Sequence, residues 1–205
     1  MDFVTPEYYT IFLPVVVVLV LFIGKQKRDN QVLMMLAMSY IFFWMASGWH
    51  ILLLLTSTLV DWTAGNKISA SDDRKIRKRW LVGSLTVNLG LLAIFKYLDF
   101  LINTWNLASL RFDGAPELDT LGLLLPVGIS FYTFQTMSYT IDIYREKHEP
   151  YEKFVDFACY AAFFPQLVAG PIVRSQHFLE QIKKPMNSNP NRFRLGLTLL
   201  IYGLA

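Results

Sequence analysis

The sequence predicts an all-α protein, a polytopic transmembrane helical bundle of about six spans. Hydrophobic residues make up 54% of the 205 residues and charged residues only 17%, and the mean hydropathy is +0.36. The apolar residues gather in long runs, which is typical of membrane-spanning helices. Lysines and arginines cluster between these runs, as they do in cytoplasmic loops. The single cysteine, Cys159, excludes an intrachain disulfide framework and is interpreted as a small core residue.

The first apolar run, residues 8–24, predicts the first span, because about 17 residues form about 25 Å of helix. It does not resemble a signal peptide, since no basic region precedes it and no small-residue cleavage site follows it. The positive charges at residues 25–28 come after this run. We therefore expect an extracytoplasmic N-terminus and a cytoplasmic first loop.

The second apolar run, residues 32–60, is too long for one straight span, because about 20 residues suffice. Gly48-Trp49-His50 interrupts it near the middle. This pattern predicts a hairpin of two helices, with Trp44 and Trp49 at the outer interface of the membrane. Histidine often transfers protons, but His50 in this turn is interpreted as an interfacial residue.

The following segments predict one further span between two loops. Residues 61–79 end in a basic cluster and predict a solvated cytoplasmic loop, which could also attract anionic lipid headgroups. Residues 80–98 predict the span, with Asn88 inside it and Lys96 extending toward the headgroups near its end. Residues 99–119 combine turn-forming residues with net negative charge and predict an extracytoplasmic loop.

The stretch from Leu125 to Arg145 is apolar enough for a bilayer, yet it carries polar side chains that a purely lipid-facing helix would not contain. At about 100° per residue, five of its residues share one arc of roughly 80°. The arc predicts a face against protein or a water-filled cavity, with its carboxylate paired or near the interface. Helix packing and a functional cavity both remain open on this pattern. The five residues are Gly128, Tyr132, Gln135, Tyr139 and Asp142.

The last part of the chain predicts one complete and one incomplete span. Residues 154–168 predict a span that ends at the strong helix breaker Gly170-Pro171. Residues 178–191 are polar and end any helix. Residues 193–204 begin another apolar helix, but about 12 residues do not cross a hydrocarbon core of about 30 Å. We therefore expect the sequence to be truncated within a span.

Two blocks of this sequence match a known signature. The first, LPVGISFYTFQ at residues 125–135, is followed by Ser138-Tyr139 and by Asp142-x-Tyr144-Arg145, and the second is FFPQLVAGPIVR at residues 163–174. Together they resemble the membrane-bound O-acyltransferase (MBOAT) family, in particular its bacterial alginate O-acetyltransferase branch. The D-alanyl-transferring relatives are also similar, but they usually carry an acidic residue where Val173 stands and differ around Gln166. The resemblance thus favours acetylation of a sugar over D-alanyl transfer to a cell-wall polymer, which stays an alternative.

The resemblance implies that residues 1–205 are the N-terminal part of one MBOAT transmembrane domain whose C-terminal half is absent. Such proteins transfer an acyl group, here expected to be acetyl, from a thioester donor to hydroxyls of an exported polysaccharide or a partner protein. The donor would resemble acetyl-CoA or an acyl carrier, and no bound cofactor or metal is expected. Expected partners are the lipid bilayer, the acyl donor, an extracytoplasmic acetyltransferase and the polysaccharide, without nucleic acid. The expected location is the cytoplasmic (inner) membrane, with several passes.

The family's catalytic histidine lies downstream of this chain, according to the resemblance. His50, His148 and His177 do not stand at matching positions, so we expect the chain alone to be inactive. A transporter or channel subunit and a non-catalytic assembly subunit remain alternatives, because a broken polar helix suits them as well. The candidate pocket residues are Pro126, Gly128, Ser130, Tyr132, Gln135, Tyr139, Asp142, Arg145, Pro165, Gln166, Gly170, Pro171 and Arg174.

Other catalytic patterns are absent from the sequence. It contains no glycine-rich phosphate loop, no His/Cys spacing suited to a metal and no Gly-x-Ser-x-Gly elbow. Ser130 follows Gly128 at the right distance, but no glycine stands at position 132. Ser130 is therefore interpreted as a small packing residue rather than an acylated nucleophile.

Overall fold

The structure is a computed structural model that describes residues 8–23, 26–109, 118–167, 170, 173–185 and 190–204. Every regular element within these residues is a helix, so the predicted all-α class is confirmed. In chain order the elements are η1 (Tyr8–Phe12), α1 (Leu13–Ile23), α2 (Arg28–Ser47), η2 (Gly48–His50), α3 (Ile51–Ser69), α4 (Arg74–Ser109), α5 (Ile129–Tyr144), α6 (Phe154–Ala162), α7 (Phe164–Leu167), α8 (Ser175–Ile182) and α9 (Pro190–Leu204).

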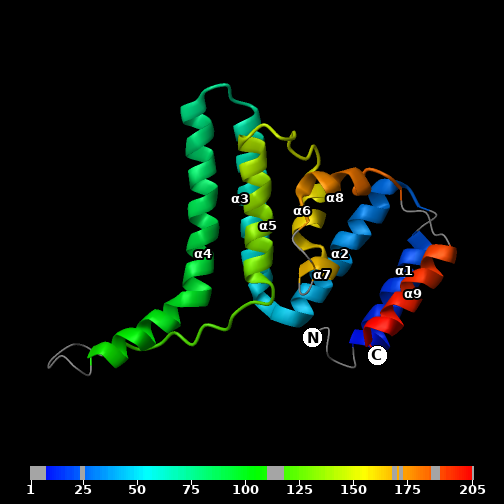
Figure 1. The fold of residues 1–205 in the computed structure, drawn as a ribbon, viewed down its shortest axis with the longest axis horizontal. Helices are drawn as coiled ribbons and strands as arrows, with labels where there is room; N and C mark the ends of the chain where they lie inside the picture. Colours follow the sequence, from blue (N-terminus) through cyan, green and yellow to red (C-terminus); the bar gives the residue numbers. More distant parts are fainter. Residues whose placement is uncertain are drawn as a thin grey trace.

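The helices α2 to α8 pack in two groups that meet at α6. In Figure 1, α3, α4 and α5 lie together, and each packs against the other two. The short helices α6 and α7 lie against α2, and α6 also contacts α3, α5 and α8. The main core lies where these groups meet, and its fully buried members include Phe43, Leu54, Ile68, Tyr139 and Phe157.

The predicted hairpin of residues 32–60 is confirmed. The first helix ends where Gly48 adopts a φ of 57°, a conformation that glycine tolerates without strain, and a turn of 3-10 helix leads into α3. His50 is only 5% exposed in this turn: its ring stacks on Trp49 at 4.1 Å, and its Nδ1 lies 2.7 Å from the carbonyl oxygen of Ser47. Trp44 and Trp49 are exposed.

The cytoplasmic loop predicted for residues 61–79 is wrong for most of its length. The third helix continues to Ser69, and α4 begins at Arg74, so only residues 70–73 form the turn. The helix continues because Asp61, Ala64 and Ile68 are buried at helical spacing against neighbouring helices. The basic cluster therefore lies on the first turns of α4. Asp73 caps that helix by accepting a hydrogen bond from the Lys75 amide at 2.7 Å.

The loop predicted for residues 99–119 is also partly wrong, because α4 runs to Ser109 and bends on the way (Figure 1). Its polar residues bind the returning chain instead of ending the helix. Asp99 accepts hydrogen bonds from the amides of Leu121 and Leu123, both at 2.9 Å. Asn106 exchanges two hydrogen bonds with the main chain of Leu118.

The single span predicted for residues 154–168 is replaced by two helices of 9 and 4 residues, each too short to cross a hydrocarbon core of about 30 Å. The break falls at Phe163, whose ψ of 102° is not helical. Pro165 lacks the amide proton needed to continue α6, but it is tolerated in the first turn of α7. Ser39 Oγ then accepts a hydrogen bond from the Phe164 amide at 3.3 Å.

Two described segments, Arg28–Ser69 and Arg74–Ser109, are long and apolar enough to cross a membrane by length and composition. The first comprises α2, the turn at Gly48 and α3. Large apolar side chains such as Leu52, Val82 and Leu89 are exposed on the outer faces of α3 and α4. This arrangement supports a membrane protein, while the number of six spans and the orientation of the N-terminus stay predictions.

Candidate functional site

The two sequence blocks singled out above touch each other at the start of α5. This helix begins at Ile129, so Gly128 is its N-cap and does not belong to the helical arc, contrary to the prediction. Gly128 has a φ of 73°, and a Cβ atom at this position would lie 2.5 Å from the carbonyl oxygen of Leu167. Glycine is required here for two reasons, because the backbone is left-handed and the second block passes against it. Pro126, two residues earlier, is buried.

The three central residues of the predicted polar stripe are buried in the described structure. Tyr132, Gln135 and Tyr139 are 2%, 3% and 0% exposed. The helix α5 packs against α3, α4 and α6 (Figure 1). Phe134, which points away from this face, is 46% exposed. The stripe therefore faces protein, as its periodicity predicts.

Gln135 joins α5 to the end of α6. Its Nε2 donates a hydrogen bond to the carbonyl oxygen of Tyr160 at 2.8 Å, and Tyr160 Oη donates to the carbonyl oxygen of Gln135 at 3.2 Å. Tyr160 lies in the last turn of α6, where carbonyl groups have no partner within the helix, so the Gln135 amide satisfies one of them. The Tyr160 hydroxyl shares its single proton with the carbonyl oxygen of Val173, which lies 3.1 Å from Oη and belongs to the second block.

Three polar atoms near this face have no hydrogen-bond partner within the described residues. They are the hydroxyl oxygens of Tyr132 and Tyr139 and the Oε1 of Gln166. Gln166 lines a small cavity of about 180 Å³ between α2, α7 and α8, whose wall also includes Met35 and Phe178. Buried polar groups are normally satisfied, so Gln166 Oε1, which borders this cavity, is available to a bound molecule or water.

The remaining candidate residues lie apart from this cluster. Asp142 is paired with Lys147 at 2.9 Å near the end of α5, which agrees with the expectation that its carboxylate is either paired or near the interface. Arg145, Pro165 and Arg174 are exposed.

Two more candidates have contacts of their own, and one cannot be placed. Lys96 Nζ donates to Ser130 Oγ at 3.3 Å. Gly170 approaches Gln166 closely, with its amide donating to the Gln166 carbonyl oxygen at 3.1 Å. Pro171 lies outside the described residues.

A buried carboxylate at the centre of α3, α4 and α5 was missed at the sequence level. Asp61 is 0% exposed and accepts hydrogen bonds from Ser84 Oγ, from Asn88 Nδ2 at 2.9 and 3.0 Å, and from Thr140 Oγ1 at 3.3 Å. Ser57 Oγ donates in turn to Asn88 Oδ1. The sequence does contain a pattern that indicates a buried helix here, because small residues recur every three or four positions on both sides of Asp61. A charged residue was instead interpreted as the start of a loop.

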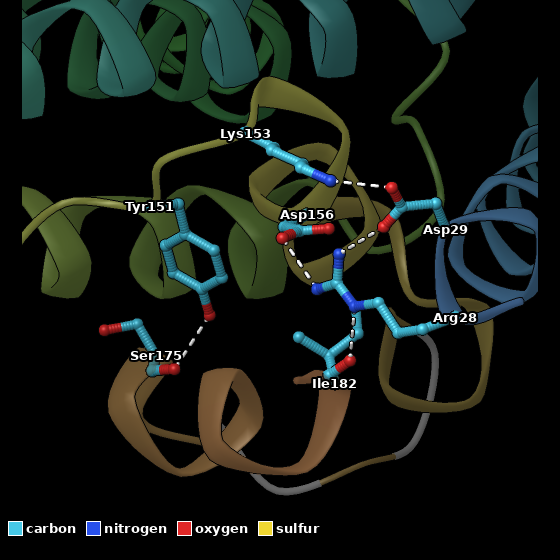
Figure 2. A network of polar contacts seen from close by, with 7 residues as sticks. All are labelled: Arg28, Asp29, Tyr151, Lys153, Asp156, Ser175 and Ile182. Atoms are coloured by element: carbon cyan, nitrogen blue, oxygen red, sulfur yellow. Dashed lines mark hydrogen bonds and ion pairs between the residues drawn. The ribbon is translucent and has the colours of Figure 1, made fainter. Parts of the chain in front are cut away.

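A second polar network, also missed, connects the start of α2 with α6 and α8 (Figure 2). The Arg28 guanidinium donates to Asp156 at 2.7 Å, to Asp29 at 3.0 Å and to the carbonyl oxygen of Ile182 at 2.9 Å. Lys153 reaches Asp29 from the other side at 2.7 Å. The network holds the end of α8 against α2. It therefore fixes the position of α8, the helix that directly follows the second sequence block.

The loop before α6 is tied to the start of α8. Tyr151 Oη donates to the carbonyl oxygen of Ser175 at 2.8 Å, and burial raises the pKa of Tyr151, so this phenol stays a neutral donor. His148 Nε2 lies 2.7 Å from Ser175 Oγ, and its Nδ1 lies 2.8 Å from the carbonyl oxygen of Glu149. Ser175 is 1% exposed, so this contact is a structural tie between the two segments.

A cavity of about 580 Å³ opens beside this tie, between the loop and α8. Its wall includes the carboxylates of Glu149, Glu152 and Glu180 and the ammonium group of Lys183. No group of three or more potential metal ligands occurs among the described residues. None of the candidate residues from the two sequence blocks lines this cavity.

Comparison with known proteins gives a consistent result over nearly the whole chain. A probable alginate O-acetylase, AlgI, of Pseudomonas aeruginosa is 33% identical over 207 residues, which covers 99% of this chain and 38% of the relative. The corresponding protein of Pseudomonas putida is also 33% identical, over 99% of this chain and 41% of its own length. The chain is a homologue of the alginate O-acetylases. This confirms the resemblance to the alginate branch of the MBOAT family that the two sequence blocks indicate.

The O-acetylase homologues extend beyond alginate. A peptidoglycan O-acetyltransferase of Helicobacter pylori is 29% identical over 98% of this chain and 42% of its own length. The chain thus spans about two fifths of the length of these curated relatives, between 38% and 42%. No family model matches the chain, and no solved structure matches it.

Proposed function

We propose that this chain is part of a membrane O-acyltransferase that transfers an acetyl group from a thioester donor to hydroxyl groups of an exported polysaccharide or of a partner protein. The similarity to proteins named as alginate and peptidoglycan O-acetylases, over 98–99% of the chain, carries this proposal. The donor resembles acetyl-CoA or an acyl carrier. An extracytoplasmic acetyltransferase receives or completes the transfer to the polysaccharide.

The reaction needs few groups. A hydroxyl oxygen attacks the thioester carbonyl carbon, the carbon–sulfur bond breaks, the thiol leaves and a base takes the hydroxyl proton. We assign no base to the three histidines of this chain: His50 is enclosed by aromatic rings, His148 is bound to Ser175, and His177 is exposed on α8. The base is a histidine supplied from outside these residues. A closed, dry pocket limits hydrolysis of the thioester.

The role of this chain is to form a wall of that pocket. The buried face of α5, the end of α6 and residues 163–167 provide a rigid surface, because Gly128 and Gln135 connect them. Gln166 Oε1, which has no partner among the described residues and borders a cavity, is the polar contact that this wall offers. A rigid wall lowers the entropic cost of aligning donor and acceptor.

A chimeric enzyme tests the proposal. Residues 1–205 replace the matching segment of the Pseudomonas aeruginosa relative in a strain that lacks its own copy, and the acetyl content of the secreted alginate is measured. We expect acetylation well above that of the deletion strain. A chimera that accumulates normally in the membrane but leaves the alginate without acetyl groups would refute the proposal.

Two further arms make the test specific. The same chimera carrying Phe134→Leu, a change on the exposed face of α5, serves as the control and retains acetylation. The isolated chain, incubated with acetyl-CoA and alginate oligosaccharides, is expected to transfer no acetyl. Thioester-dependent acetylation by the isolated chain would place the catalytic base within these residues and contradict its assignment to a histidine outside them.

A further inference from the structure

An apolar groove runs between α3 and α4 on the outside of the helix group. Its volume is about 400 Å³, and it is lined by Leu59, Thr63 and Ala64 of α3 and by Trp80, Gly83 and Val87 of α4, among others. Both helices belong to segments that are long and apolar enough to cross a membrane. The groove therefore faces the hydrocarbon region of a bilayer rather than water.

The few polar residues of the groove are satisfied within the protein. Thr63 Oγ1 donates to the carbonyl oxygen of Leu59 at 2.7 Å, and Ser84 Oγ donates to Asp61. Gly83 leaves space, because a Cβ atom at this position would meet no heavy atom within 4 Å. The groove thus offers an apolar channel without unsatisfied donors, which fits a hydrocarbon chain and no polar ligand.

Cations surround the end of the groove near the turn between the two helices. Lys67 follows Thr63 by four residues on α3, so it continues the groove-lining face. On α4, Arg79 precedes Gly83 by four residues and lies about 40° from it around the helix, and about 90° from the middle of the groove-lining face. Both side chains are exposed. Trp80, which is 39% exposed, lies at the same level, as aromatic residues do at a membrane interface.

The charge at this end is positive and not neutralised by ion pairs. None of Lys67, Arg74, Lys75, Lys78 and Arg79 forms a salt bridge within the part of the chain that the structure describes. Two carboxylates, Asp72 and Asp73, lie in the turn, and Asp73 accepts the hydrogen bond from the Lys75 amide. Arg77 is different, because it faces inward and pairs with Glu146. Cations therefore outnumber carboxylates at the mouth of the groove.

We propose that the α3/α4 groove binds one anionic phospholipid, with an acyl chain along Leu59, Gly83 and Val87 and the phosphate between Lys67 and Arg79. A phospholipid has an apolar chain attached to a charged headgroup. The groove has the matching arrangement, because its apolar lining continues into a cationic end. A second protein copy would have to bury the unpaired charges of Lys67 and Arg79 against its own surface. A lipid supplies the opposite charge.

The site is tested by native mass spectrometry of the detergent-purified chain, titrated with dioleoyl phosphatidylglycerol or with dioleoyl phosphatidylcholine. We expect the anionic lipid to bind more tightly. Lys67→Ala and Arg79→Ala should each weaken its binding about fivefold, because one cation near an anionic surface contributes about 1 kcal/mol. Binding of the zwitterionic lipid should change less.

A matched control separates this site from diffuse attraction. Lys78→Ala removes the same charge from the same turn of α4, but Lys78 points about 170° away from the middle of the groove-lining face. It should leave the affinity for phosphatidylglycerol within about twofold of the parent, by the usual screening of exposed charges. Equal losses for Lys67→Ala, Arg79→Ala and Lys78→Ala would overturn the proposal.

A second variant tests the groove itself. Gly83→Leu enters a space in which an added Cβ meets no heavy atom within 4 Å, and it replaces glycine by a better helix former, so we expect the variant to fold. We expect it to weaken binding of both lipids, and the melting curve of the variant confirms its folding. Unchanged lipid binding by the folded Gly83→Leu variant would exclude the groove as the chain site. The same spectra could instead contain a dimer that disappears with Gly83→Leu. That result would show that the groove binds a second copy of the chain, and it would overturn the lipid proposal.

Discussion

Gln135 and Tyr160 are joined by two hydrogen bonds in opposite directions, one from the glutamine side chain and one from the tyrosine hydroxyl, each to the main chain of the other residue. This pair connects the first sequence block to the helix that precedes the second. The glutamine amide caps the end of α6, a role that a polar stripe on a helical wheel does not reveal.

The first prediction is that Gln135→Leu destabilises the protein. Leucine leaves the Tyr160 carbonyl oxygen buried without its donor, which costs about 1–3 kcal/mol. We expect a clear drop in the apparent melting temperature in detergent. In the chimera, loss of acetylation in proportion to the amount of folded protein would show that Gln135 only holds the helices together. Loss of acetylation at normal stability would show that its side chain also borders the acyl route.

Gly128→Ala is expected to be more damaging than an ordinary glycine substitution. A left-handed conformation costs a non-glycine residue about 1–3 kcal/mol, and here the added Cβ also meets the Leu167 carbonyl oxygen. Gly83→Ala is the matched control, because Gly83 lies in a helix with open space around it and should gain about 0.5–1 kcal/mol. Comparable melting temperatures for the two variants would contradict the close contact between the two blocks.

The Asp61 network is tested by exchange of its partners. Asp61→Asn replaces one acceptor oxygen by an NH₂ donor that faces the donors of Asn88, Ser84 and Thr140, so at least one of them loses its acceptor, at about 1–3 kcal/mol. Asp61→Asn combined with Asn88→Asp restores one carboxylate and one amide in the same space. We expect the double variant to recover most of the lost thermal stability. A double variant as unstable as the sum of the two single changes would rule out a direct pairing of these side chains.

Arg28→Lys is expected to behave as a disruptive change, although it conserves charge. The guanidinium binds Asp29, Asp156 and the Ile182 carbonyl oxygen at once, and one ammonium group cannot reach all three. We expect a loss of about 1–3 kcal/mol. Lys153→Gln is the control, because its ion pair with Asp29 is exposed on both sides and contributes about 0–1 kcal/mol. Similar melting temperatures for the two variants would show that the network is only a surface feature.

The predicted orientation in the membrane can be tested by cysteine labelling. Asp72→Cys in the turn before α4 should be protected from a membrane-impermeant maleimide in intact cells, whereas Leu121→Cys should react. The expectation rests on the basic residues that follow the turn. Cys159 is buried and supplies little background. Labelling of position 72 from outside intact cells would reverse the orientation.

Periodicity was sufficient to find the buried face of α5, because polar residues at Tyr132, Gln135 and Tyr139 recur at helical spacing whatever surrounds them. It also located the turn at Gly48, where a long apolar run had to break. The same reasoning missed Asp61, since one charge in a sequence indicates a loop unless its partners are known. Those partners lie on helices that only tertiary packing brings together, and the same is true of Arg28 and Asp156.

The boundaries of the spans failed for a related reason. Hydropathy shows which segments are apolar but not where a helix breaks or ends. The break at Phe163 and the continuation of α4 beyond Asp99 were therefore not predicted. In both places a side chain binds the main chain of a distant segment. Ser39 meets the Phe164 amide, and Asp99 meets the amide of Leu121.

The contact between Arg28 and Ile182 also sets an order of events during synthesis. The two residues are 154 positions apart, so at about 5–20 residues per second the ribosome needs on the order of 10–30 s to make the second after the first. Throughout that interval the Arg28 guanidinium lacks the carbonyl oxygen of Ile182 as a hydrogen-bond acceptor. The contact between the start of α2 and the end of α8 can therefore form only late, after every helix from α2 to α8 has been made.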